Sequence, residues 1–102
     1  MEILVFGASS LFFNAYATRI IEALQGSGYE YSLSKMTLRV GAYTYRYIGE
    51  PERIRGINQE RVGKIVILPR FVENPRHDEL DVELRVIYAR NPKITIETPH
   101  YV

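Results

Sequence analysis

The stretch GASS, which begins at Gly7, lies between an apolar run and a run with helical periodicity. A phosphate-binding loop or a nucleophilic serine could stand at such a place. A dinucleotide fingerprint requires glycine where Ser9 and Phe12 stand, and a P-loop requires glycine and lysine at Phe12 and Phe13. A hydrolase elbow places its serine at Ser9 but requires glycine at Leu11. We therefore expect a core strand, a helix capped by a serine of this stretch, and core positions for both phenylalanines.

Segment 73–83 carries the other residues suited to acid–base or metal chemistry. His77 and Asp81 share a face if this segment is helical, but the second histidine, His100, is far along the chain, and a zinc site normally needs three or four ligands. The acids that could act as general acids are Glu73, Asp78 and Glu79. No neighbour marks one of them out, so we expect a solvated helix start without a metal site or a catalytic residue. A small enzyme using an acid of this segment or a serine of GASS is the weakest of three functional hypotheses.

The segment 36–48 has the clearest local pattern, with strict alternation on both sides of Gly41-Ala42. A glycine in the first position of a two-residue loop favours a type II′ turn, and the hairpin then pairs Val40 with Tyr43. Further pairs along the two strands are Leu38 with Tyr45 and Met36 with Tyr47. All six side chains share one face. The other face is wet and basic, with Lys35, Thr37, Arg39, Thr44 and Arg46.

The tyrosines of this hairpin are the candidate partner-binding residues: Tyr43, Tyr45 and Tyr47. Tyrosine is favoured at the centre of protein interfaces, and it also fills cores. Two interpretations remain open. The face is covered by the first helix and belongs to the core, or it is half covered and accepts a protein partner or a second copy of the chain.

Residues 39–70 carry seven basic residues against three acidic ones, although the whole chain has a net charge of only +1. The planar guanidinium group suits phosphate oxygens. A second hypothesis is therefore nucleic-acid binding by the residues Arg39, Arg46, Arg53 and Arg55. A solvated charged surface without a ligand explains the same composition.

The remaining patterns predict the order of the elements. Strands are expected at 2–8, 64–68 and 93–98, a helix from the GASS stretch to a cap at Gly26, and a short helical turn at 51–56. Residues 74–90 fit both a helix and a strand, and the helix is preferred because Asn74-Pro75 suits its start and Arg90 its end. The predicted fold class is α/β, a small mixed sheet that is partly parallel, with a hairpin and two to three helices.

The bulk composition bounds the class of protein. With 102 residues, a single domain is expected, and a faint strand–helix–β rhythm also allows two similar halves, about 1–50 and 51–102. There is no cysteine, so disulfides and thiolate metal sites are excluded and the redox compartment cannot be inferred. No apolar run is near the length of a membrane span, and the N-terminal apolar run does not have the pattern of a signal peptide, so we expect an intracellular, cytoplasmic protein with no membrane partner.

Several short strings resemble part of a RecA-like ATPase core of the phage terminase and helicase type. ILVFGASS resembles its first strand, the segment up to Arg55-Gly56 resembles its β insertion and turn, and KIVIL resembles the strand that carries the catalytic acids. KITIETP resembles the next strand, which ends in Thr98-Pro99. The Walker A segment is absent, and Pro69-Arg70 follow Leu68 where the acids would stand. The resemblance thus implies a viral or phage origin and a non-catalytic remnant that needs no nucleotide or other cofactor.

From the sequence we therefore expect a non-enzymatic interaction module that binds a protein partner or itself through the aromatic hairpin surface. The alternative is a nucleic-acid-binding accessory protein that uses the basic segment 39–70.

Overall fold

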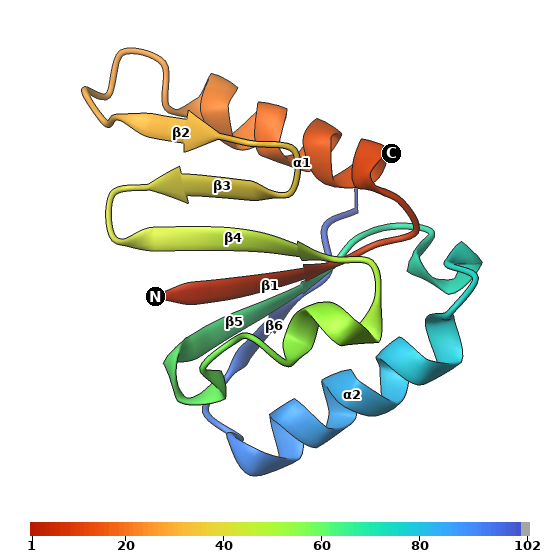
Figure 1. The fold of residues 1–102 in the computed structure, drawn as a ribbon. Helices are drawn as coiled ribbons and strands as arrows, with labels where there is room; N and C mark the ends of the chain where they lie inside the picture. The colour runs from red at the N-terminus through yellow and green to blue at the C-terminus, as the bar shows by residue number, and fades with distance from the viewer. Residues whose placement is uncertain (101–102) are drawn as a thin grey trace.

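The computed structural model describes residues 1–100 as an α/β fold built on one sheet of six strands (Figure 1). The strands are β1 (Glu2–Phe6), β2 (Tyr31–Leu33), β3 (Thr37–Val40), β4 (Tyr43–Ile48), β5 (Val62–Ile67) and β6 (Thr95–Glu97). Two α-helices, α1 (Ser10–Ala23) and α2 (His77–Arg90), accompany them, with the short 3₁₀ turns η1 (Pro51–Ile54), η2 (Gln59–Arg61) and η3 (Phe71–Glu73). The predicted fold class is confirmed.

The sheet is mixed, and its order is β2-β3-β4-β1-β5-β6. The central strand β1 runs parallel to β4 and β5, and β5 runs parallel to β6. The strands β2, β3 and β4 form an antiparallel meander, which extends the parallel part on one side. The meander is the part of the sheet that contains the candidate site.

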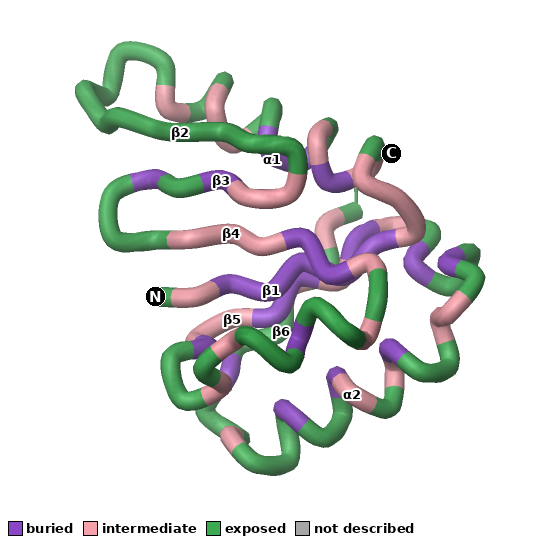
Figure 2. The backbone as a smooth tube through the Cα atoms, in the orientation of Figure 1, coloured by how far each residue is buried: buried purple, intermediate pink, exposed green. Residues whose placement is uncertain are grey.

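Each face of the sheet has its own apolar core. Figure 2 shows that much of the central strand β1 is buried between them. On one face, α1 packs Phe13, Tyr16 and Ala17 against Ile3, Val5, Leu38, Val40 and Tyr47. On the other face, α2 packs Leu80, Leu84 and Ile87 against Leu4, Phe6, Ile48 and Ile65. The alternation of side chains along β1 explains why odd and even residues serve different cores. Both faces of β1 are therefore covered, as its continuous apolar sequence predicts.

The helix α1 begins where the sequence predicts, but its N-cap works differently. Ser9 occupies the cap position in an extended conformation, and its side chain makes no capping hydrogen bond. The backbone closes the first turn instead, since the N–H of Phe12 donates to the carbonyl oxygen of Ser9 at 3.2 Å. The prediction that a serine hydroxyl caps this helix is therefore wrong for Ser9. Phe13 is fully buried and Phe12 partly so, as core anchors should be.

The predicted hairpin is confirmed in its register. Val40 pairs with Tyr43 and Leu38 with Tyr45, and the N–H of Tyr47 donates to the carbonyl oxygen of Met36 at 2.9 Å. Gly41 has a φ of 55°. A positive φ at the first loop position, with none at Ala42, is what a type II′ turn requires.

The strand β2 is the element that the sequence patterns did not predict. Its three residues, Tyr31, Ser32 and Leu33, pair with Val40, Arg39 and Leu38 of β3. A three-residue strand is too short for alternation to separate it from a loop. The hairpin is thus the inner part of a meander, and β2 lies at the edge of the sheet.

The segment 74–90 resolves as a helix, but only from His77 onward. Asp78 and Glu79 lie in its first turn and Arg90 in its last, which favours a helix through the helix dipole. No helix among residues 1–100 is long and apolar enough to span a membrane.

Asn74, just before α2, ties three segments together. Its side chain is buried, and its amide nitrogen donates to the carbonyl oxygens of Gly7 at 2.8 Å and of Gly49 at 3.2 Å. Its amide oxygen accepts from the N–H of Arg76 at 2.8 Å. The hydroxyl of Tyr47 donates to the same Gly7 oxygen at 3.2 Å. These bonds join the carboxyl ends of β1 and β4 to the start of α2.

Gly7 fits this junction because a side chain would crowd it. A Cβ atom there would lie 3.1 Å from Cδ1 of Leu68 and 3.4 Å from the ring of Tyr47. The glycine that raised the question of a phosphate loop therefore permits close packing at the end of β1, and its carbonyl serves as a shared acceptor.

Replacing Asn74 with alanine should lower the free energy of unfolding by about 2–4 kcal/mol, because the carbonyls of Gly7 and Gly49 each lose a donor and α2 loses a bond at its start. The matched control is Asn91→Ala, which removes one long side-chain bond, 3.4 Å, at a half-buried position. That change should cost less than about 1 kcal/mol. Urea unfolding of both variants measures the difference, and equal costs would contradict the role of Asn74.

Candidate functional site

The three candidate tyrosines of β4 have very different surroundings. Tyr47 is buried, lies against Phe13 with ring centroids 5.8 Å apart, and donates its hydroxyl to Gly7. Tyr45 is half-buried and makes an edge contact with Tyr16 at 6.2 Å. Tyr43 is 48% exposed. Only the N-terminal part of this row of tyrosines can therefore offer much surface to a partner.

Burial also affects the ionisation of the two inner tyrosines. The pKa of Tyr45 is raised above its usual value, first by burial and then by the carboxylate of Glu97. Burial likewise raises the pKa of Tyr47, against an opposing effect of Arg53. Both hydroxyls therefore stay neutral at physiological pH, as side chains in a core should.

The exposed apolar residues of the meander lie around its edge strand. Tyr31 and Leu33 on β2 are 49% and 42% exposed, and Tyr29 just before the strand is 65% exposed. Tyr31, Val40 and Tyr43 stand opposite one another on three neighbouring strands. We call Tyr29, Tyr31, Leu33 and Tyr43 the aromatic edge.

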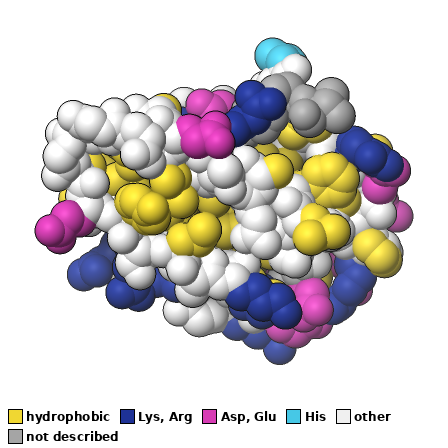
Figure 3. Space-filling model, turned by 90° about the horizontal axis from the view of Figure 1, so that it is seen from above, with side chains coloured by type: hydrophobic (Ala, Val, Ile, Leu, Met, Phe, Trp, Pro, Cys, Tyr) yellow, Lys and Arg dark blue, Asp and Glu magenta, His cyan; other side chains and the backbone are white. Residues whose placement is uncertain are grey.

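Figure 3 views the molecule from the side on which α1 and β2 lie, and hydrophobic side chains are visible there in the middle of the surface. Charged side chains lie mostly toward the rim of this view. An apolar centre within a polar rim is the usual arrangement of a protein interface.

Within residues 1–100, the backbone of β2 adds polar groups without a hydrogen-bond partner to this edge. In an antiparallel pair, successive residues alternately direct their N–H and C=O groups toward the partner strand and away from it. The N–H of Ser34 donates to the carbonyl oxygen of Thr37, at 2.8 Å, and so points toward β3. The N–H and C=O groups of Leu33 and Tyr31 therefore point away from β3, to the free side of the sheet.

A shallow hollow of about 490 Å³ lies at the start of this edge. It is lined by Gly28, Tyr29, Glu30, Tyr31, Ser32, Arg39 and Gly41. Two aromatic rings and one charge of each sign thus surround an open surface beside β2, where side chains of a bound segment could lie.

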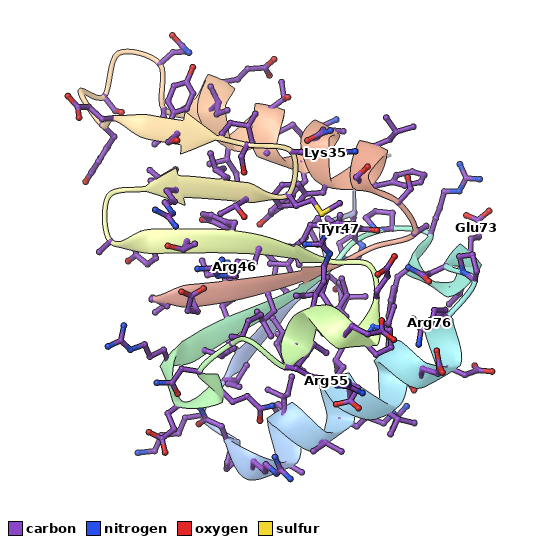
Figure 4. The ribbon with its side chains drawn as sticks, in the orientation of Figure 1. Lys35, Arg46, Tyr47, Arg55, Glu73 and Arg76 are labelled. Atoms are coloured by element: carbon purple, nitrogen blue, oxygen red, sulfur yellow. The ribbon has the colours of Figure 1, made fainter. Side chains whose placement is uncertain are left out.

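Of the four candidate nucleic-acid-binding arginines, Arg39 and Arg46 lie on the opposite face of the meander, Arg53 lies on η1, and Arg55 follows η1 directly. Figure 4 labels Arg46 and Arg55. Arg46 is engaged, since its Nε atom lies 2.7 Å from a carboxylate oxygen of Glu2. Arg46 and Arg53 line a small groove of about 220 Å³. Within residues 1–100, no ion pair involves Lys35, Arg39, Arg53 or Arg55.

The acids of segment 73–83 are largely held by arginines. Glu73 pairs with Arg70, Glu79 pairs with Arg76, and Asp81 pairs with Arg85 at 2.9 Å. The pKa of Glu73 is lowered by its hydrogen bonds from Arg70, so this acid is a poor proton donor at neutral pH. Over the described part of the chain, no three His, Asp or Glu residues lie close enough to hold a metal ion.

The residues after β1 and β5 meet at the carboxyl ends of the parallel strands, where many α/β proteins bind ligands. A groove of about 400 Å³ lies there, lined in part by Ser10, Tyr47, Arg53 and Arg76. Arg76 is held by Glu79 and by Glu52, the latter at 2.7 Å. Asn74 already occupies the junction between the strand ends.

Sequence reasoning therefore found one of the residues of the aromatic edge, Tyr43, and missed those on and before β2. The alternation of Tyr29, Tyr31 and Leu33 was the signal available, but it extends over too few positions to predict a strand.

Comparison with known proteins adds no relative: no family model, no curated protein and no solved structure matches this chain.

Proposed function

We propose that this chain is a non-enzymatic interaction module that binds a protein segment along the aromatic edge. The observation that supports this function is the combination on β2 of exposed apolar side chains with backbone groups that point away from the sheet. An extended segment that pairs with such a strand gains backbone hydrogen bonds and side-chain contacts together.

The composition of the edge strand strengthens this proposal. Proteins usually protect an edge strand with a charge, a proline or a covering loop. The other edge strand, β6, contains Glu97, which pairs with Lys64 at 3.1 Å, and Pro99 follows two residues later. The three residues of β2 themselves include no charge and no proline, and the nearest charges are Glu30 directly before the strand and Lys35 two residues after it. We infer that the edge of β2 is unprotected in the single chain because a strand of a binding partner covers it in the complex.

The non-enzymatic part of the proposal rests on the engaged acids of segment 73–83 and on the bulky residues around Ser9. The same proposal places the protein in the cytoplasm, of a host cell if it is viral. Its relation to RecA-like ATPases stays a prediction from short strings of sequence.

Replacing Leu33 with lysine should weaken binding to a protein partner without unfolding the chain, because a charge at the edge opposes strand pairing and the side chain is not part of the core. The matched control is Val72→Lys on η3, where the side chain is 71% exposed and distant in sequence from the edge. Partners captured by the wild type are identified, purified and titrated against each variant.

We expect a loss of at least about tenfold in affinity for Leu33→Lys and no change for Val72→Lys. Equal affinities of a purified partner for all three proteins would contradict the proposed surface.

A second candidate function is nucleic-acid binding by the basic face of the meander. The observation that favours it is that α2 does not cover β2 and β3, where Ser32, Thr37 and Arg39 face solvent beside Lys35. Hydroxyl and guanidinium groups are common phosphate ligands.

If this second function is right, the chain should shift a labelled oligonucleotide at about 50 mM salt, and binding should weaken steeply as salt rises. The double variant Arg39→Ala/Arg53→Ala should reduce the slope of log affinity against log salt by about 2. The control Arg85→Ala removes an exposed arginine from α2 and should leave the slope unchanged. Affinity that does not depend on salt would remove this candidate.

A further inference from the structure

The aromatic edge is complementary to itself when two copies meet in antiparallel orientation. A two-fold axis perpendicular to the sheet, midway between the Ser32 residues of the two copies, would set Tyr31 of one copy opposite Leu33 of the other. The outward N–H and C=O groups belong to these two residues, so both pairs would exchange two hydrogen bonds each. A register shifted by two residues would pair Tyr31 with Lys35 in one direction and Leu33 with Tyr29 in the other. In each case one partner lies outside the strand Tyr31–Leu33.

The charges around β2 are compatible with the same register. Glu30 would stand opposite Ser34, and Lys35 would stand opposite Tyr29, so no two like charges meet. An ammonium group beside a tyrosine ring is an attractive pair. A symmetric interface requires this self-complementarity, because every residue meets the symmetry mate of its partner.

The two helices α1 would then lie on the same face of a continuous sheet, one on each side of the axis. Ile21 and Leu24, near the end of α1, are half-buried members of the core on that face. Their exposed parts would extend the apolar contact beyond the strands themselves.

On these grounds we propose that the occupant of the aromatic edge is a second copy of this chain, joined through antiparallel β2–β2 pairing with Ser32 on the two-fold axis. The proposal rests on the proposed function and names its partner. Exposed parts of Tyr29, Tyr31 and Leu33 amount to about 300 Å² of surface per copy, so strand pairing alone gives a weak, concentration-dependent dimer.

The register can be tested directly because the chain has no cysteine. In Ser32→Cys, the two thiols would face each other in a non-hydrogen-bonded pair, where Cα atoms lie about 4.5 Å apart, within the range of a disulfide. In the matched variant Ser34→Cys, the thiol is also exposed and on the same side of the chain but lies two residues from the axis. Both variants are treated with copper phenanthroline as oxidant after their native circular dichroism has been verified.

We expect Ser32→Cys to form the disulfide dimer at least about tenfold faster than Ser34→Cys, and sedimentation of the wild type to show a dimer that dissociates on dilution. Adding Leu33→Lys to Ser32→Cys should remove the advantage. Equal rates for the two cysteine variants, or a wild-type monomer at about 500 µM, would overturn the dimer. If the wild type is monomeric but a different purified protein binds it in a Leu33-dependent manner, the proposed function stands and only the identity of the partner is wrong.

Discussion

Two helices of fourteen residues have to cover a sheet of six strands, and this limit determines what the rest of the surface can be. A helix is roughly 10 Å wide and strands lie about 4.8 Å apart, so one helix covers two to three strands. The helix α1 covers one face over β3, β4 and β1, and α2 covers the other face over β4, β1 and β5. Neither helix fully covers the strand β2. The hydrogen bond from Asn74 to Gly7 fixes the start of α2 at the carboxyl end of β1, and in this position α2 leaves β2 uncovered.

The uncovered parts of the meander differ in chemistry on its two faces. The face opposite α1 is polar, with Arg39 exposed beside hydroxyl side chains, and it is suited to water or phosphate. On the face that α1 covers, the outermost side chains are those of Tyr31 and Leu33, which are suited neither to water nor to phosphate. Apolar side chains and unpaired backbone groups on one strand together favour another strand as the covering element, since each alone is better satisfied by a helix or by water.

The sequence predicts this fold well where a pattern is long or a residue is constrained. Period-two alternation determined which residues of the hairpin share a face, and Gly41 favoured the register that the structure has, although a two-residue slip would keep the same faces. Asp78, Glu79 and Arg90 favoured the helix over the strand in 74–90. The aromatic edge was predicted only through Tyr43, because a strand of three residues has too little pattern to be recognised and its exposure depends on where α1 ends. Tyr47 shares the alternation of Tyr43, yet the sequence could not show that its ring lies under α1 beside Phe13. The bonds of Asn74 link residues far apart in the chain, so only the folded structure reveals them.

The central claim is that another strand covers β2, and amide hydrogen exchange at single residues tests it most directly. The amides of Tyr31 and Leu33 point outward and should exchange freely in dilute protein, whereas the amide of Ser34 already donates to Thr37 and serves as an internal reference. Raising the protein concentration into the range of the dimer should slow exchange of Tyr31 and Leu33 by at least about tenfold and leave Ser34 unchanged. Exchange of the two outward amides that is equally fast at every concentration, and in the presence of any purified partner, would contradict the claim.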